Sequence, residues 1–204
     1  GSYVASDSDD FFAPILIPRH GPRPAEGVQQ QQPSSSAASR EHVAPAGATV
    51  RDLVDMRTGV RFSEDYLDPM AEVRLIEQAI GWAPQTVPDL PTTVYGFLAS
   101  LQQSSPHGGP FHYRSCETDI LGWVCEAAAG VPMPELMSTV LWSPIGAQRD
   151  AIIGVDQIGT GLYDGGINAC LRDLIRFGIL FNTGGVTLTG TQLAGLRYEP
   201  LYPG

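Results

Sequence analysis

From residue 49 onward, hydrophobic residues recur every three or four positions, which is the spacing of one face of an α-helix. Most of these runs start near Ser, Thr, Asp or Pro, and several stop at Gly, residues that begin and end helices. We predict six helices, beginning near Thr49, Asp68–Pro69, Thr92 or Thr93, Ser115, Pro134, and Asn168 or Ala169, and ending near Gly59, Gly81, Leu101, Gly130, Trp142 and Phe181. A short seventh is expected from Thr189 to Leu196.

The same spacing predicts which side chains point inward. On the helix that follows Ser115 these are Ile120, Leu121, Val124 and Ala128. On the helix that ends at Phe181 they are Leu171, Leu174, Ile175, Gly178 and Phe181. The sequence therefore favours a mostly helical body.

Strands are scarce in this pattern. The one convincing strand covers Ala151 to Val155, and Phe11 to Pro18 is a candidate strand or docking segment within residues 1–19. Residues 20–46 include a glutamine run and a Ser/Ala-rich tract, and such a segment buries too little apolar surface to offset its ordering entropy. We expect a linker over 20–46 and a single, partial helical domain over 47–204.

Composition excludes several classes of partner. The net charge of −10 disfavours nucleic acids and anionic membrane surfaces, which both require basic protein surfaces. No apolar run approaches the roughly 20 residues of a transmembrane helix, and no signal peptide is recognised, so a cytoplasmic location is expected. The three cysteines and four histidines have no metal-ligand spacing. We therefore expect neither a metal nor a cofactor.

The chain contains no lysine, and all twelve of its basic residues are arginine. A P-loop, a kinase site, a Schiff-base site and a Ser-x-x-Lys nucleophile each require a lysine amine. Arginine cannot replace it, because the guanidinium stays protonated at any working pH. Arginine in place of lysine is also what a GC-rich coding bias produces, but the chemical consequence is the same.

Five segments, in this order and spacing, resemble the serine β-lactamase-like superfamily of penicillin-recognising hydrolases. The branch they resemble most is that of the 6-aminohexanoate-dimer hydrolases and carboxylesterases. The segments are 48–59 (ATVRDLVDMRTG), 62–69 (FSEDYLDP), 111–123 (FHYRSCETDILGW), 141–146 (LWSPIG) and 164–178 (DGGINACLRDLIRFG). The coherent resemblance covers residues 48–188.

The resemblance implies a fold with an α/β domain and an all-helical domain inserted into it, with the active site between them. The matching segments belong mainly to the helical subdomain. The Ser-x-x-Lys helix expected before Thr49 and the closing strands expected after Gly185 are not recognised. We therefore expect a mostly α-helical part of this fold, with the α/β half largely missing.

Tyr113 occupies the position of the family's catalytic Tyr in Tyr113-Arg114-Ser115. The resemblance implies that this phenol moves protons between the nucleophilic Ser and the leaving group. A phenol acts as a base when a cation stabilises its phenolate, and the family uses the Ser-x-x-Lys ammonium for this purpose. Arg114 is a poor substitute, because neighbours in an extended segment point to opposite faces. Tyr113 can equally be an aromatic that packs at a loop-to-helix junction.

Five further residues are candidates for substrate binding. The resemblance places Tyr66 on a loop that closes over the substrate, and Asp164, Gly165 and Gly166 on a loop that borders the pocket. Ser115 is either a helix cap or a site hydroxyl that faces the substrate. Simpler readings are open for the others: Tyr66 as a loop aromatic over apolar surface, and the Gly pair as a turn. Glu77, a further candidate for a cationic substrate end, is equally well a solvated surface acid.

The sequence names no nucleophile. Gly-x-Ser-x-Gly is absent, no Ser is followed three positions later by Lys, and four serines lie in the low-complexity tract. We predict a β-lactamase-related serine hydrolase by ancestry, which acts on a small amide or ester through an acyl-enzyme and is inactive as this isolated chain. The alternatives are a non-catalytic binding module, or half of a site completed by another chain. Apolar surface exposed by a partial domain would also favour a homo-oligomer.

Overall fold

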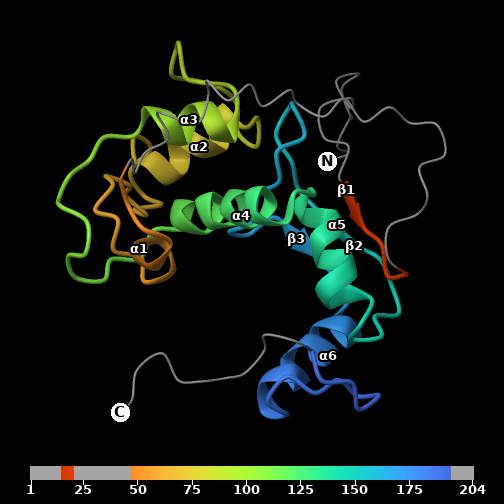
Figure 1. Ribbon diagram of the computed structural model, residues 1–204. Helices are drawn as coiled ribbons and strands as arrows, with labels where there is room; N and C mark the ends of the chain where they lie inside the picture. Colours follow the sequence, from red (N-terminus) through yellow and green to blue (C-terminus); the bar gives the residue numbers. More distant parts are fainter. Residues whose placement is uncertain (1–14, 21–46, 194–204) are drawn as a thin grey trace, which may run out of the picture. The chain divides into compact units, whose positions relative to one another are not determined.

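The structure is a computed structural model and describes residues 15–20 and 47–193 (Figure 1). These residues form two compact units. Unit 1 contains residues 47–125 and 154–166, and unit 2 contains residues 15–20, 126–153 and 167–193. Each unit is therefore assembled from segments that are separated in the sequence.

Unit 1 begins with helix α1 (Val50–Val54), which starts where the sequence predicts. The Thr49 hydroxyl accepts a hydrogen bond from the backbone N–H of Asp52, and the Asp52 carboxylate accepts one from the backbone N–H of Thr49. This reciprocal capping box satisfies two N–H groups that have no partner inside the helix. Met56 has a φ of 51°, so the helical conformation does not continue toward Gly59.

Helix α2 (Glu72–Ala79) begins later than predicted, because Asp68 caps a turn and not the helix. The Asp68 carboxylate accepts the backbone N–H of Met70, and the Asp68 carbonyl accepts that of Ala71. Helix α3 (Val94–Ser100) follows Thr93, whose hydroxyl accepts the backbone N–H of Gly96. The Thr92-or-Thr93 alternative is thus resolved in favour of Thr93.

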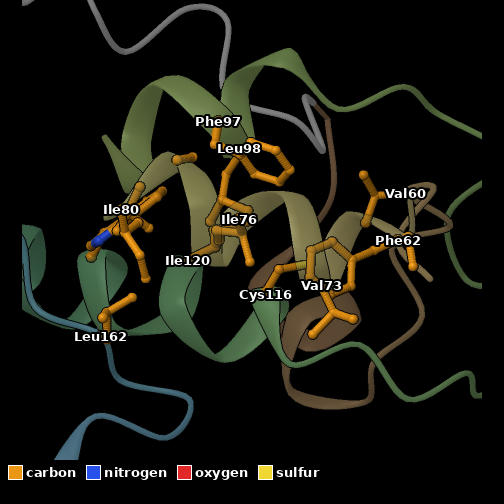
Figure 2. Packing of buried hydrophobic residues seen from close by; sticks show 14 of the residues in the cluster. Val60, Phe62, Val73, Ile76, Ile80, Phe97, Leu98, Cys116, Ile120 and Leu162 are labelled. Atoms are coloured by element: carbon orange, nitrogen blue, oxygen red, sulfur yellow. The ribbon is translucent and has the colours of Figure 1, made fainter. Parts of the chain in front are cut away.

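The core of unit 1 lies among α2, α3 and the first part of α4 (Cys116–Ala129). Figure 2 shows Ile76, Leu98 and Ile120 of these three helices pointing toward one another. Leu162, from the 154–166 segment, joins the same cluster and is 3% exposed. Burial of one such side chain contributes about 1.5–3 kcal/mol, so this later segment is bound to the helices by the hydrophobic effect.

The inward face of α4 is only partly the predicted one. Ile120 is buried, but Ala128 is exposed, and Leu121 and Val124 are half-buried. Two acids take up the buried face instead, Glu117 at 0% and Asp119 at 1% exposure. A hydrophobic pattern misses them because acids are almost never fully buried without hydrogen-bond partners.

Unit 2 contains a three-stranded antiparallel sheet in the order β1–β2–β3 (Figure 1). The strands are β1 (Ile15–Ile17), β2 (Ala151–Ile153) and β3 (Ile167–Asn168). β1 pairs with β2 over its whole length, Ile15 opposite Ile153 and Ile17 opposite Ala151. The predicted strands at 11–18 and 151–155 are both present, and residues 11–14 lie outside the described part.

The predicted helix from Pro134 to Trp142 is two kinds of helix. α5 (Met133–Met137) is α-helical, and η3 (Ser138–Trp142) continues it as a π-helix. Ser138 is fully buried, and its hydroxyl donates to the carbonyl of Pro18, just after β1. The Trp142 indole N–H donates to the carbonyl of Arg149 at 2.8 Å.

Helix α6 (Leu171–Asn182) starts after the predicted residues, because Asn168 pairs with β2 as part of β3. The predicted inward face is wrong: the buried residues of α6 are Asp173 and Leu180. The hydrophobic residues of the predicted face are exposed among the described residues, namely Leu171, Leu174, Ile175 and Phe181.

After α6 the chain forms a turn, and over 189–193 it is not the predicted helix. Val186 and Gln192 form an isolated antiparallel bridge, and the Thr187 N–H donates to the Thr191 carbonyl at 2.9 Å. Residues 194–196 of that prediction, and all but the first residue of the predicted linker over 20–46, lie outside the described residues. The domain boundary predicted between residues 46 and 47 stays a prediction.

Among the described residues, six α-helices outweigh three short strands, as expected of a mostly helical part of the fold. None of the helices in these ranges is long and apolar enough to cross a lipid bilayer.

Candidate functional site

Glu64, on the loop before α2, brings two predicted site residues together. Its Oε1 accepts the backbone N–H of Ser115 at 2.6 Å, and its Oε2 lies 3.4 Å from the hydroxyl of Tyr66. The loop and the start of α4 are 51 positions apart in the sequence. A charge-assisted bond to a backbone N–H is among the stronger hydrogen bonds of proteins, so this contact fixes the loop beside Ser115.

Ser115 directly precedes α4 and is 9% exposed. Its hydroxyl is hydrogen-bonded to the carboxylate of Asp164, and its carbonyl accepts the N–H of Thr118 at 2.8 Å. The side chain therefore connects the beginning of α4 to the loop over residues 163–166, which contains Asp164 and is called the Asp164 loop below. The role of Ser115 as a helix cap or as a site hydroxyl stays a prediction.

Tyr113 and Arg114 point in opposite directions, as expected of neighbours in an extended segment. Tyr113 is 56% exposed, whereas Arg114 is 7% exposed. The Arg114 guanidinium lies 3.2 Å from Glu117, whose carboxylate also accepts the hydroxyl of Thr58 at 2.7 Å. Arg114 is thus committed to a buried ion pair.

The pKa of the Tyr66 phenol depends on the groups around it. Partial desolvation raises the pKa of this phenol, and the charge of Glu64 and the hydrogen bond to Glu64 add to this. Tyr113 and Asp164 raise it further through their charges. Tyr66 and Ser115 therefore both contact Glu64, and the charges of Tyr113 and Asp164 are near enough to affect the Tyr66 phenol.

The Asp164 loop is seated on α4 by the ring of Tyr163. A Cβ at Gly122 would lie 1.9 Å from this ring, and one at Gly161 would lie 2.5 Å from it. Both positions must be glycine for the ring to fit. Gly166 has its own constraint, since a Cβ there would come within 2.5 Å of the Leu162 carbonyl oxygen.

Gly165 differs from Gly166, because a Cβ would have open space there. The backbone N–H of Gly166 donates to Leu162, and its carbonyl accepts the N–H of Gly154 at 2.8 Å. The Gly pair thus includes one glycine that the turn requires and one that local contacts leave unexplained.

Asp119 is a site residue that the sequence did not reveal. Its Oδ1 accepts the backbone N–H of Tyr163 at 2.7 Å and that of Asp164 at 3.2 Å. Burial and the neighbouring charge of Asp164 raise the pKa of Asp119 to about 7, against the lowering effect of the two N–H groups. One signal was available: Asp119 falls within the buried helical stripe that contains Cys116, Ile120 and Trp123.

Glu64 was also missed, although it lies in the quoted 62–69 segment. Nothing in its local pattern distinguishes it from a surface acid, because its partner Ser115 is distant in the sequence. Glu77, in contrast, pairs with Arg74 on the same helix at 2.7 Å. Its carboxylate is engaged with a neighbouring residue of α2.

The cluster as a whole is acidic and carries both donors and acceptors. Its hydroxyl groups can donate to a carbonyl, while Glu64 and Asp164 can accept from N–H groups or attract a cation. No group of three or more His, Cys, Asp or Glu suitable for a metal ion is found within 15–20 and 47–193. This arrangement can bind a polar small molecule.

Comparison with known proteins gives the same family as the quoted motifs. The family model described as Beta-lactamase matches residues 27–203. The 6-aminohexanoate-dimer hydrolase of Paenarthrobacter ureafaciens is 35% identical over 167 residues, which are 82% of this chain and 41% of that protein. A solved structure, the putative 6-aminohexanoate-dimer hydrolase from Bacillus anthracis, superposes with a TM-score of 0.64 at 28% identity.

That superposition covers 72% of this chain and 38% of the solved one. The chain thus spans about two fifths of the length of these relatives. The order of motifs, the fold and the family model agree, and the resemblance seen in the sequence is confirmed. The chain belongs to the β-lactamase family.

Proposed function

We propose that the chain carries the tyrosine side of the active site of a β-lactamase-related hydrolase that cleaves small amides or esters through an acyl-enzyme. The observation that supports this most is that Glu64 contacts both Ser115 and Tyr66, while Ser115 is hydrogen-bonded to Asp164 and Tyr113 is near enough to affect the Tyr66 phenol. The names of the two relatives, both hydrolases of the 6-aminohexanoate dimer, support an amide as the substrate.

In this proposal Tyr113 is the catalytic residue. Its side chain is exposed, so its hydroxyl is free of the core and can pass a proton between a serine nucleophile and the leaving group. Tyr66 and Ser115 bind polar atoms of the substrate, and the Asp164–Gly166 turn borders the substrate. Arg114 takes no part, because its guanidinium is bound to buried Glu117.

The nucleophile and the cation beside Tyr113 come from residues outside these 204 in this proposal, because the sequence contains no lysine. The chain alone is then inactive or nearly so, and the site is complete only with a further segment or a second chain. We test this with a fluorophosphonate serine probe and intact mass. We expect no adduct; a stoichiometric adduct that disappears on heat unfolding would contradict this part and identify the serine.

The role of Tyr113 is tested in a complete site. Residues 47–193 replace the matching segment of the Paenarthrobacter ureafaciens hydrolase, and hydrolysis of the 6-aminohexanoate dimer is measured. Tyr113→Phe should lower kcat about 10²–10⁴-fold, the usual contribution of general acid–base catalysis. Tyr95→Phe is the matched control, because the Tyr95 ring stacks on Trp123 with centroids 3.9 Å apart, outside the site.

Two outcomes would contradict the assignment of Tyr113 as the catalytic residue. Either Tyr113→Phe keeps its kcat within twofold of the unsubstituted chimera, or Tyr95→Phe loses as much activity as Tyr113→Phe. A large loss in Tyr113→Phe alone supports the proposal.

A further inference from the structure

Asp119 has an unusual set of contacts for a carboxylate. It is 1% exposed, and its Oδ1 accepts two backbone N–H groups, from Tyr163 and Asp164. Its Oδ2 is buried and has no hydrogen-bond partner among the described residues. An ionised carboxylate with one oxygen neither solvated nor bonded is strongly unfavourable in a protein interior.

The charged groups around Asp119 do not stabilise an anion either. Burial, and then the charge of Asp164, raise the pKa of Asp119; burial, and to a lesser extent the charge of Glu64, raise that of Asp164. On α4, burial raises the pKa of Cys116, and the charges of Glu117 and Asp119 add to this, so these groups lie close together.

The Arg114 guanidinium, which comes from just before α4, is paired with Glu117. Asp119 therefore faces acids from the loop and from its own helix.

We propose that Asp119 is a positioning residue that, as an uncharged acid, holds the backbone of Tyr163 and Asp164 against α4 so that Asp164 remains bonded to Ser115. The role is indirect: Asp119 acts on the site through the loop backbone and touches no substrate. Its importance for catalysis rests on the proposed function of Asp164 and Ser115, but its control of the loop does not.

The packing beside Asp119 explains why a single acid can control this loop. Gly122 lies one turn further along the same face of α4, and the Tyr163 ring occupies the space that a Cβ there would fill. The ring and the two N–H bonds together attach the loop to one stripe of the helix. Loss of the bonds to Asp119 leaves the ring contact alone.

Ionisation of Asp119 would place a second negative charge next to Asp164. Burial and the charge of Asp164 set the pKa of Asp119 at about 7, so this happens as the pH rises through neutrality. Repulsion between the two carboxylates then loosens the loop from α4. The site is thus expected to be better ordered at pH 6 than at pH 8.5.

The first test follows the Asp119 carboxyl itself. The full chain is labelled with ¹³Cγ-aspartate and titrated by NMR from pH 3 to 9, with Asp119→Asn to assign the signal. We expect one carboxyl to titrate near pH 7, to be missing in Asp119→Asn and to move to lower pH in Asp164→Asn. Asp68→Asn, at an exposed turn, leaves it unchanged. Titration of every aspartate below pH 5 would overturn the proposal.

The second test measures how firmly Asp119 holds the Asp164 loop. Amide hydrogen exchange at Tyr163 and Asp164 is compared at pH 6 and pH 8.5 after correction for intrinsic rates. The unsubstituted chain should lose protection about tenfold or more, the effect of one pKa unit.

In Asp119→Asn, which keeps the Oδ1 acceptor without charge, the amides of Tyr163 and Asp164 should stay protected from exchange at both pH values. In Asp119→Ala they should be protected at neither pH. If Asp119→Asn shows the same pH response as the unsubstituted chain, Asp119 has no such role. Asp119→Asn keeps the test valid even if Asp119→Ala does not fold. Because neither readout uses catalysis, a failed hydrolysis assay and a failed loop test remain distinct results.

Discussion

Asp119 of unit 1 and Asp173 of unit 2 are both aspartates that solvent barely reaches, at 1% and 0% exposure. Asp173 accepts the backbone N–H groups of Gln148 and Arg149 and pairs with Arg176 at 2.8 Å. Burial alone would raise the pKa of Asp173, but the hydrogen bond from the Cys170 thiol, the two N–H groups and Arg176 outweigh it and lower the pKa.

Asp119 also accepts two N–H groups, but its charged neighbour is an acid. The two sites thus differ in their other neighbours: Asp173 has a thiol donor and the Arg176 cation, whereas Asp119 has an acid. With a cation, a buried aspartate becomes a stable charged anchor; with an acid, it retains a proton to about pH 7. Burial by itself does not decide the charge state of a carboxyl group.

The largest effect that separates the two sites is expected at Asp173. Asp173→Ala leaves the Arg176 guanidinium and two backbone N–H groups without their carboxylate, and should lower the free energy of unfolding by about 3 kcal/mol. Urea unfolding followed by circular dichroism measures it. A loss below about 1 kcal/mol would mean that the ion pair contributes little and that the comparison rests on burial alone.

A second effect should come from Gly122→Ala, because the new Cβ would overlap the Tyr163 ring. Overpacking of this kind costs typically about 1–3 kcal/mol. It should also release the Asp164 loop and lower the pKa of Asp119, since Asp164 then moves away. Gly178→Ala is the matched control on α6, where a Cβ meets nothing within 4 Å and the change should stabilise the helix by about 0.5–1 kcal/mol.

The pH dependence of stability should carry opposite signs at the two sites. The raised pKa of Asp119 means that its folded state keeps a proton which the unfolded chain has released, so its contribution is full below about pH 4 and is lost as the pH rises through 7. The lowered pKa of Asp173 gives stability that is present above about pH 4 and is lost as the pH falls below it.

Melting temperatures measured from pH 3 to 9 separate these contributions. Asp119→Asn should flatten the decline between pH 4 and 7, and Asp173→Asn should flatten the fall below pH 4. The assignment of opposite signs is wrong if either variant changes the other limb of the curve.

The smallest expected effect is that of Cys170→Ala. The Cys170 thiol lies 3.0 Å from Oδ2 of Asp173, and a thiol is a weak donor. Its removal should raise the pKa of Asp173 and cost about 0.5–1 kcal/mol. An effect as large as that of Asp173→Ala would show that the thiol, and not Arg176, is the main partner.

The sequence predicted helices best where local chemistry decides them. The Thr49 capping box and the Thr93 cap need only residues three positions apart, and both helices begin there. Asp68 shows the limit, since its side chain caps a turn that the pattern cannot distinguish from a helix start. Asn168 could not be recognised as a strand residue, because its partner Ile152 is distant in the sequence.

For the site, the family resemblance supplied Tyr66, Tyr113, Ser115 and Asp164 as candidates, and long-range contacts supplied the rest. Tyr113 and Asp164 were candidates because they occupy family motifs, and their catalytic and binding roles stay predictions. Glu64 and Asp119 were missed because their partners lie 51 and 44 positions away. On α6, the buried position of Asp173 was missed because the pattern assigns charged residues to the surface.

The pairing of β1 with β2 also affects how the protein is made. Arg19, next to β1, donates its backbone N–H to Asp150, which lies 131 positions later. At about 5–20 residues per second, a ribosome needs on the order of ten seconds to synthesise the chain between them. The core of unit 1 includes Leu162, so unit 1 also cannot be completed before residue 162 has been synthesised. Neither unit can therefore complete folding before the residues up to Leu162 have been synthesised, and ribosome-associated chaperones are expected to bind the nascent chain during that interval.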